Sequence, residues 1–129
     1  KPVFPTQRLR PTLVATALTS LAEAAIGLLL LLHLQKAFAL DIVSIALQED
    51  VALVGLSILS GAHVALTTRT VDALRAADAG DIAVVVGGTI PGSDVQKLLD
   101  AGAAAVFPTG TPLEDLVRDV RALTEKAGE

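Results

Sequence analysis

The chain has 129 residues and a net charge of −4, and 52% of its residues are apolar against 19% charged. This composition excludes a disordered chain and is typical of a globular domain that buries a substantial core. The sequence contains no Cys and no cluster of Lys and Arg, which excludes disulfides and gives no basic surface for nucleic acid. We therefore expect no nucleic-acid partner.

The N-terminal segment, Lys1–Arg10, has two prolines and three basic residues without an apolar period. This pattern predicts an N-terminal arm or linker over residues 1–11, followed by one domain over residues 12–129. The chain starts at Lys1-Pro2 and not at Met, so we expect a fragment or a processed chain.

The next segment is strongly apolar. We expect a first strand at Thr12–Ala15, a helix over Leu18–Ile26 that ends at Gly27, and a buried second strand at Leu28–Leu32. The apolar run Ala24–Leu32 has nine residues, whereas a membrane-spanning helix needs about 20. The run also lacks the cleavage site of a signal peptide. We therefore predict no membrane association and a cytoplasmic location.

Apolar runs and helical segments continue to alternate along the rest of the chain. The predicted helices are Asp41–Gln48, capped by Asp41, and His63–Ala77, and the predicted strands are Val51–Leu56, Ile82–Val86 and Ala104–Phe107. Two capping boxes, Ser93-Asp94-Val95-Gln96 and Thr111-Pro112-Leu113-Glu114, predict the starts of the last two helices. The apolar stripe of the final helix is predicted to be buried on the sheet; it consists of Leu113, Leu116, Val117, Val120 and Leu123.

Five apolar strands that alternate with helices predict an α/β fold, an open five-stranded parallel sheet with helices on both faces. Such sheets bind ligands beyond the carboxyl ends of their strands. Three predicted loops lie at that edge, Ser57–Gly61, Gly87–Pro91 and Pro108–Pro112, and they are rich in Gly, Ser, Thr and Pro. One such loop is an ordinary turn. Three at one edge favour a ligand site.

Two stretches carry a family resemblance, "VALVGLSILSGAH" (Val51–His63) and "IAVVVGGTIPGSDVQKLLDAGAAAVFPTGT" (Ile82–Thr111). From about Gln48 onward the chain resembles the cobalamin-binding domain of the methylmalonyl-CoA mutase family, including the separate small subunits of its isobutyryl-CoA and 2-hydroxyisobutyryl-CoA relatives. The resemblance implies a flavodoxin-like (Rossmann-like) fold. It also implies adenosylcobalamin as the cofactor, with its nucleotide tail in a slot between the sheet and the helices.

The same resemblance implies which residues hold the tail. Ser57 and Leu59 would line the slot, and Gly87-Gly88 would let the tail pass close to the backbone. Gly110 and Thr111 would lie near its far end. The predicted cofactor-binding set is completed by two further loop residues, Gly61 and Thr89. The isomerase chemistry would belong to the cofactor and to a separate barrel subunit or domain that binds the acyl-CoA, so this chain would not be catalytic alone.

The chain departs from the family at one motif. The family carries Asp-x-His-x-x-Gly after its first strand, and this His is the lower axial ligand of cobalt; Leu13–Gly27 contains neither Asp nor His. Thr12–Leu32 is also short, at 21 residues, for a strand-helix-strand unit of about 30. Two alternatives stay open: the loop is deleted from this molecule, or the molecule carries a segment that the printed sequence does not include.

Neither of the two histidines replaces the missing ligand convincingly. His33 is interpreted as a polar residue that ends a strand, and His63 as a helix-start or loop-bracing residue. We predict no metal site made of protein ligands alone and no catalytic residue. Two hypotheses follow, a cobalamin-binding domain or small subunit of an acyl-CoA mutase, and a degenerate module of the same fold that no longer binds the cofactor.

Overall fold

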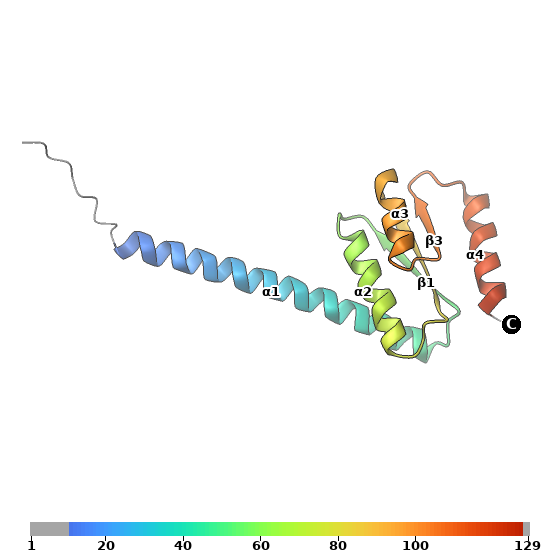
Figure 1. Cartoon of the computed structure of the whole chain (residues 1–129), viewed down its shortest axis with the longest axis horizontal. Helices are drawn as coiled ribbons and strands as arrows, with labels where there is room; N and C mark the ends of the chain where they lie inside the picture. Colours follow the sequence, from blue (N-terminus) through green and yellow to red (C-terminus); the bar gives the residue numbers. More distant parts are fainter. Residues whose placement is uncertain (1–10, 128–129) are drawn as a thin grey trace, which may run out of the picture. The chain divides into compact units, whose positions relative to one another are not determined.

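The computed structural model describes residues 11–127, and the chain divides into two compact units, Lys1–Gln35 and Lys36–Glu129. Of the arm predicted at residues 1–11, residues 1–10 lie outside the described residues, and Pro11 is the first residue of a helix. Figure 1 gives the order of the helices and strands along the chain.

The first element, helix α1, spans Pro11–Gln48. The strands predicted at Thr12–Ala15 and Leu28–Leu32 are therefore wrong, and Asp41 lies inside a helix and does not cap one. The physical reason is that Leu and Ala are strong helix formers, whereas strands favour β-branched and aromatic residues. Gly27 costs a helix only about 1 kcal/mol relative to Ala, which its many Ala and Leu neighbours offset.

In the first unit, the side chains of residues 17–34 of α1 are exposed. The stretch Ala17–Gln48 is long and apolar enough to cross a membrane, judged by length and composition. The nine-residue apolar run Ala24–Leu32 is part of this longer helix and is not a buried strand, so its own length does not decide whether the helix can cross a membrane. Core helices of soluble proteins and signal sequences also meet these criteria of length and composition. The absence of membrane association therefore stays a prediction.

The second unit contains a parallel sheet with the order β1-β2-β3. Its strands are β1 (Leu53–Ile58), β2 (Ala83–Gly88) and β3 (Ala105–Pro108). They confirm the last three predicted strands, each of which ends one or two residues later than expected. In the described part of the chain the sheet has three strands, so the α/β class is confirmed and the count of five is not.

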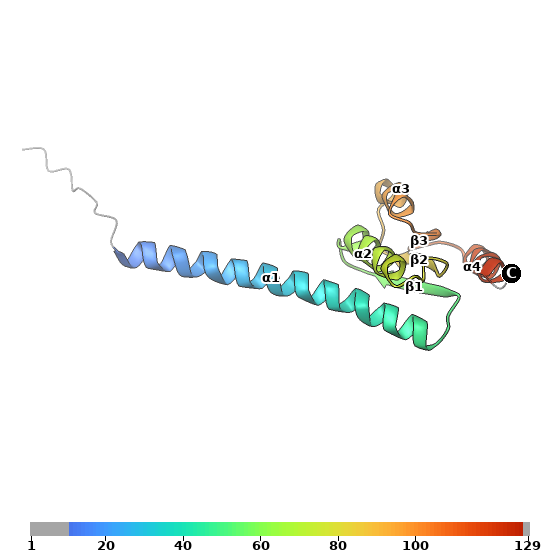
Figure 2. The ribbon, with the colours of Figure 1, turned by 60° about the horizontal axis from the view of Figure 1, so that its bottom comes forward.

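The sheet is covered by helices on both faces (Figures 1 and 2). Helices α2 (His63–Ala76) and α3 (Gly92–Asp100) lie on one side, and α4 (Leu113–Ala127) lies on the other. The core lies on the α2–α3 side, where Leu56 and Ile58 of β1 and Val84 and Val86 of β2 belong to one buried cluster with residues of those helices, Val71, Leu74 and Leu98. The end of α1 contributes Val43 and Ala46 to this cluster.

The two predicted capping boxes are not formed. Helix α3 begins at Gly92 after an N-cap at Pro91, so Ser93 lies inside the helix, and Pro91 makes no side-chain capping bond. The Thr111 hydroxyl donates to the carbonyl oxygen of Pro108 at 2.7 Å and braces the turn before α4. A capping pattern in the sequence is only local, and here the Thr111 hydroxyl bonds the preceding turn and does not cap the helix.

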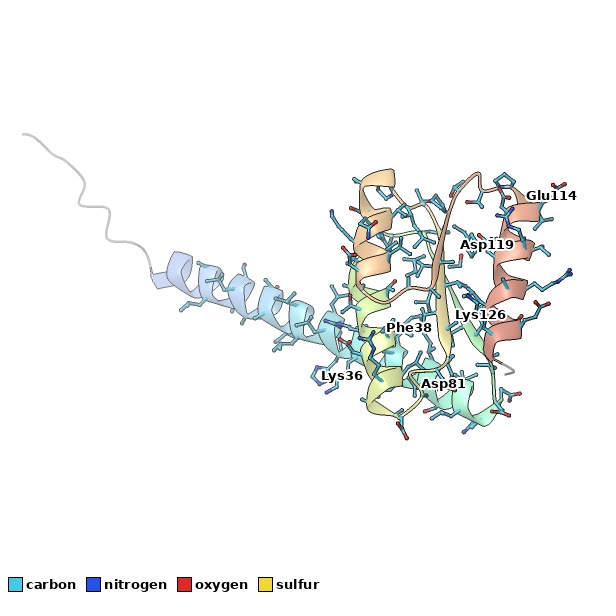
Figure 3. The ribbon with its side chains drawn as sticks, turned by 45° about the vertical axis from the view of Figure 1, so that its right-hand side comes forward. Lys36, Phe38, Asp81, Glu114, Asp119 and Lys126 are labelled. Atoms are coloured by element: carbon cyan, nitrogen blue, oxygen red, sulfur yellow. The ribbon has the colours of Figure 1, made fainter. Side chains whose placement is uncertain are left out.

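Helix α4 does not bury its apolar stripe fully, contrary to the prediction. Leu113 is 72% exposed and Val117 is 44% exposed, while the other stripe residues are half-buried. In Figure 3, Glu114 at the start of α4 lies at the edge where the strands end, and Asp81 lies at the opposite edge, before β2. The half-buried residues Leu116 and Val120 line a space that is left between α4 and the sheet.

Candidate functional site

The space under α4 is a groove of about 400 Å³. Its lining comes from all three strands and from α4: Gly55, Leu56, Ser57, Val85, Gly87, Gly88, Phe107, Leu116 and Val120. Small-molecule sites usually have volumes of about 300–1,000 Å³ and mostly apolar walls with a few polar groups. The groove therefore has the size and the chemistry of a ligand site.

The strand register explains why the groove exists. Side chains alternate between the two faces of a strand, so Gly55 and Ser57 of β1 share a face. The register pairs Ser57 with Gly87 and Gly87 with Phe107, which places these residues side by side across the sheet. A Cβ on Gly55 would come no closer than 3.8 Å to Val85, and one on Gly87 would reach 3.4 Å from the Phe107 carbonyl oxygen. The absence of side chains at Gly55 and Gly87 thus opens the groove. Close packing of the neighbouring backbone does not require glycine at either position.

Gly88 has a different reason to be glycine. Its φ is +127°, and a Cβ there would overlap the carbonyl group of Ile58 on β1. Its own carbonyl oxygen accepts from the backbone N–H of Ile90 at 3.0 Å, and from the N–H and hydroxyl of Thr109 at 2.9 and 3.0 Å. Gly88 therefore joins the loop after β2 to the loop after β3.

The predicted cofactor-binding residues fall into two sets. Ser57, Gly87 and Gly88 line the groove together. The remaining predicted residues lie in the loops at the carboxyl ends of the strands and outside the groove lining: Leu59, Gly61, Thr89, Gly110 and Thr111. Leu59 is 78% exposed there. Their contact with a cofactor stays a prediction.

The groove also contains residues that the sequence-based prediction missed, above all Gly55 and Phe107. A signal for Gly55 was present, because a single glycine inside an apolar strand marks a place where another group comes close. Phe107 offered no comparable signal, since an aromatic residue in a strand is usually core.

A cluster of polar side chains lies on the face of the sheet opposite the groove, near the carboxyl ends of the strands. His63, the first residue of α2, is buried, and its Nδ1 lies 3.2 Å from the Ser60 carbonyl oxygen. This contact confirms the predicted loop-bracing role. Its Nε2 lies 2.8 Å from Asp94 Oδ2, and Lys97 Nζ lies 2.7 Å from Asp94 Oδ1. The hydrogen bonds from Lys97 and His63 hold the pKa of Asp94 below its ordinary value of 3.8.

Among the described residues, neither histidine belongs to a group of side chains that could bind a metal ion. His33 lies on α1 with its Nδ1 3.2 Å from the Leu29 carbonyl oxygen. Within residues 11–127, no group of three or more His, Asp or Glu is arranged to hold a metal ion. The stretch Leu13–Gly27 is part of α1 and contains no His or Asp.

Comparison with known families decides the identity of this fold. The family model described as "B12 binding domain" matches residues 13–117. The chain belongs to the B12-binding domain family. The matched range contains the whole of β1, β2 and β3 and reaches into α4, so it includes every residue of the groove except Val120.

The B12-binding domain has relatives among acyl-CoA mutases. It is 44% identical over 75 residues to the methylmalonyl-CoA mutase large subunit of Streptomyces virginiae, covering 58% of this chain and 10% of that protein. It is 42% identical over 80 residues to the methylmalonyl-CoA mutase of Escherichia coli K12, covering 62% and 11%. It is also 38% identical over 86 residues to the pivalyl-CoA mutase small subunit of Xanthobacter autotrophicus, covering 67% and 57%. These relatives confirm the resemblance to the mutase family.

The B12-binding domain thus spans about a tenth of the large mutase chains and 57% of the small subunit. The cobalamin-binding function inferred from the motifs around Ser57 and Gly87 is supported by the family match.

Proposed function

We propose that this chain holds adenosylcobalamin for an acyl-CoA carbon-skeleton mutase, as a domain or as a separate small subunit, with the nucleotide tail in the groove under α4. The observation that carries the proposal is the sheet face on which Gly55, Ser57 and Gly87 leave a groove beneath a helix with a half-buried apolar stripe. A ligand there would cover Leu116 and Val120 of α4, which are half-buried in its absence.

The residues present fit the tail of such a cofactor. Gly55 and Gly87 provide the floor without side chains, and Phe107, Leu116 and Val120 provide apolar walls for a flat aromatic base. Ser57 is exposed and offers a hydroxyl that donates or accepts a hydrogen bond. When bound, the cofactor would supply the radical chemistry of the rearrangement.

The two histidines do not fit the role of ligand on the lower face of cobalt. His63 has both ring nitrogens within hydrogen-bond distance of other groups, and His33 lies on α1 outside the groove. We therefore assign to this chain the binding of the tail and derive no step through the metal.

The partner in this proposal is a separate barrel domain or subunit that binds the acyl-CoA, and the location is the cytoplasm. The two methylmalonyl-CoA mutase relatives support the existence of such a partner, because this chain matches only about a tenth of each. The remaining length of such a mutase must hold the substrate.

The test is retention of a coloured corrinoid. The protein is mixed with hydroxocobalamin, desalted, and its visible spectrum recorded; we expect the colour to travel with the protein. Ser57→Leu should reduce retention because the larger side chain fills the groove, whereas Ser93→Leu, an exposed position on α3, should bind like the parent. A parent that loses all colour on desalting would refute the proposal and leave the degenerate module as the account of this fold.

A further inference from the structure

The His63 side chain lies between two hydrogen-bond acceptors. The Ser60 carbonyl oxygen faces Nδ1 at 3.2 Å, and the Asp94 carboxylate faces Nε2 at 2.8 Å. The side chain is 5% exposed, and that of Asp94 is 18% exposed. A carbonyl and an ionised carboxylate only accept, so each contact is a hydrogen bond when the ring nitrogen that faces it carries a proton.

These contacts join parts of the chain that are far apart in sequence. Ser60 lies in the loop after β1, which carries the Ser57-Ile58-Leu59 motif, and Asp94 lies in the first turn of α3, directly after the loop Thr89–Pro91. On the other side of that loop, the Gly88 carbonyl oxygen accepts from Thr109 in the loop after β3. Hydrogen bonds on both sides of the Thr89–Pro91 loop therefore tie it to the loop after β1 and to the loop after β3.

A purely stabilising role explains this pair poorly. Apolar side chains already pack α2 and α3 on the sheet, including Val71, Leu74 and Leu98. Burying a hydrogen-bonded polar pair costs desolvation that offsets part of its attraction, so its net stabilisation is modest, whereas the contact still fixes the geometry of both side chains. Asp94 carries a lowered pKa because of its bonds to Lys97 and His63, which keeps the carboxylate ionised for the contact.

We propose that His63 and Asp94 form a clamp that holds the loop after β1 and the loop after β2 in fixed positions beside the groove, and thereby slows the release of a bound cobalamin. The proposal assigns both as positioning residues that do not touch the metal, and it rests on the proposed function of the groove. Lys97 is a helper of Asp94 within α3, since it bonds the other carboxylate oxygen from an exposed position.

Two measurements test the clamp. The first is hydrogen exchange of residues 59–62 and 89–90 in the cobalamin-free protein, and the second is the rate of hydroxocobalamin release from the loaded protein. Asp94→Ala should speed exchange in both loops and release about tenfold, as expected for the loss of one charge-assisted hydrogen bond. Asp94→Asn should restore most of the parent's slow exchange and slow release, because its amide can donate through N–H or accept through its oxygen and so keeps a hydrogen bond to His63 Nε2.

Two variants serve as controls. Lys97→Ala leaves the His63–Asp94 contact in place and should behave like the parent. Asp72→Ala removes an exposed carboxylate from α2, where it pairs with Arg75 at 3.9 Å, and should also behave like the parent.

The clamp is refuted if Asp94→Ala matches Asp72→Ala in both measurements. Exchange that rises equally in the α2 interior, at Leu74, would also overturn it, because that result reports general loosening of the fold. If the parent holds no cobalamin, the proposed function fails, and the exchange measurement on the cobalamin-free protein still decides whether the clamp fixes the two loops.

Discussion

Gly88 crosses so close to Ile58 that a Cβ on Gly88 would overlap the Ile58 carbonyl group. Its neighbour Gly87 has no such conflict and lines the groove. The backbone geometry therefore requires glycine at position 88, whereas Gly87 is free of that requirement and contributes to the groove.

Alanine substitutions should separate these two roles. Gly88→Ala should lower the free energy of unfolding by roughly 3 kcal/mol or more, because it adds a positive-φ penalty to a backbone overlap. Gly87→Ala should keep the fold and weaken cobalamin retention. Denaturant unfolding and the desalting assay measure the two effects, and equal unfolding curves for both variants would contradict the assignment.

Burial predicts different costs for two leucines. Leu74 on α2 is 1% exposed, so Leu74→Ala should destabilise the cobalamin-free protein by about 2–5 kcal/mol. Leu116 on α4 is only half-buried, so Leu116→Ala should cost about 1–2 kcal/mol, in proportion to the smaller apolar area removed from water. Urea denaturation of the two variants tests this order; a larger loss for Leu116→Ala would show that α4 packs more tightly on the sheet.

Two buried threonines on α2 offer a matched pair. Both are fully buried, but the Thr67 hydroxyl has no hydrogen-bond partner in the described residues, whereas the Thr70 hydroxyl donates to the Leu66 carbonyl oxygen at 2.9 Å. Thr67→Val should raise the free energy of unfolding by about 1 kcal/mol because it removes an unpaired buried group. Thr70→Val should lower it by a similar amount. Thermal unfolding of both variants gives the signs, and a stabilised Thr70→Val beside a destabilised Thr67→Val would reverse the interpretation.

Asp94 predicts a loss of stability in acid. Because its pKa is lower in the folded protein than its ordinary value of 3.8, its ionised form stabilises the fold above that value. The contribution is lost as the pH falls through the lower folded pKa. The free energy of unfolding should therefore decrease below about pH 4, and the decrease should be smaller in Asp94→Asn. Parallel acid titrations of parent and variant measure the difference, and identical slopes would contradict it.

Much of the second unit could be predicted from local patterns. Apolar runs that contain Val or Ile specify β1, β2 and β3 because β-branched residues favour strands, and Gly80 marks a turn after a helical segment. The same patterns placed Ser57, Gly87 and Gly88 at the carboxyl ends of parallel strands, where they line one groove. Leu28–Leu32 was misassigned because a pure leucine run has no β-branched residue to distinguish a buried strand from a helix.

The sequence by itself determined the apolar runs of β1 to β3, the glycine positions at their ends and the family to which the chain belongs, since these depend on residue types close together in the chain. Only the tertiary structure decided that Gly55 and Phe107 join the groove, that α4 leaves its apolar stripe half-buried, and that His63 meets Asp94 from 31 residues away. The physical reason is that register and helix docking arise from packing between distant segments. A local pattern states which residues can face a core or a groove, and the packed sheet selects which of them do.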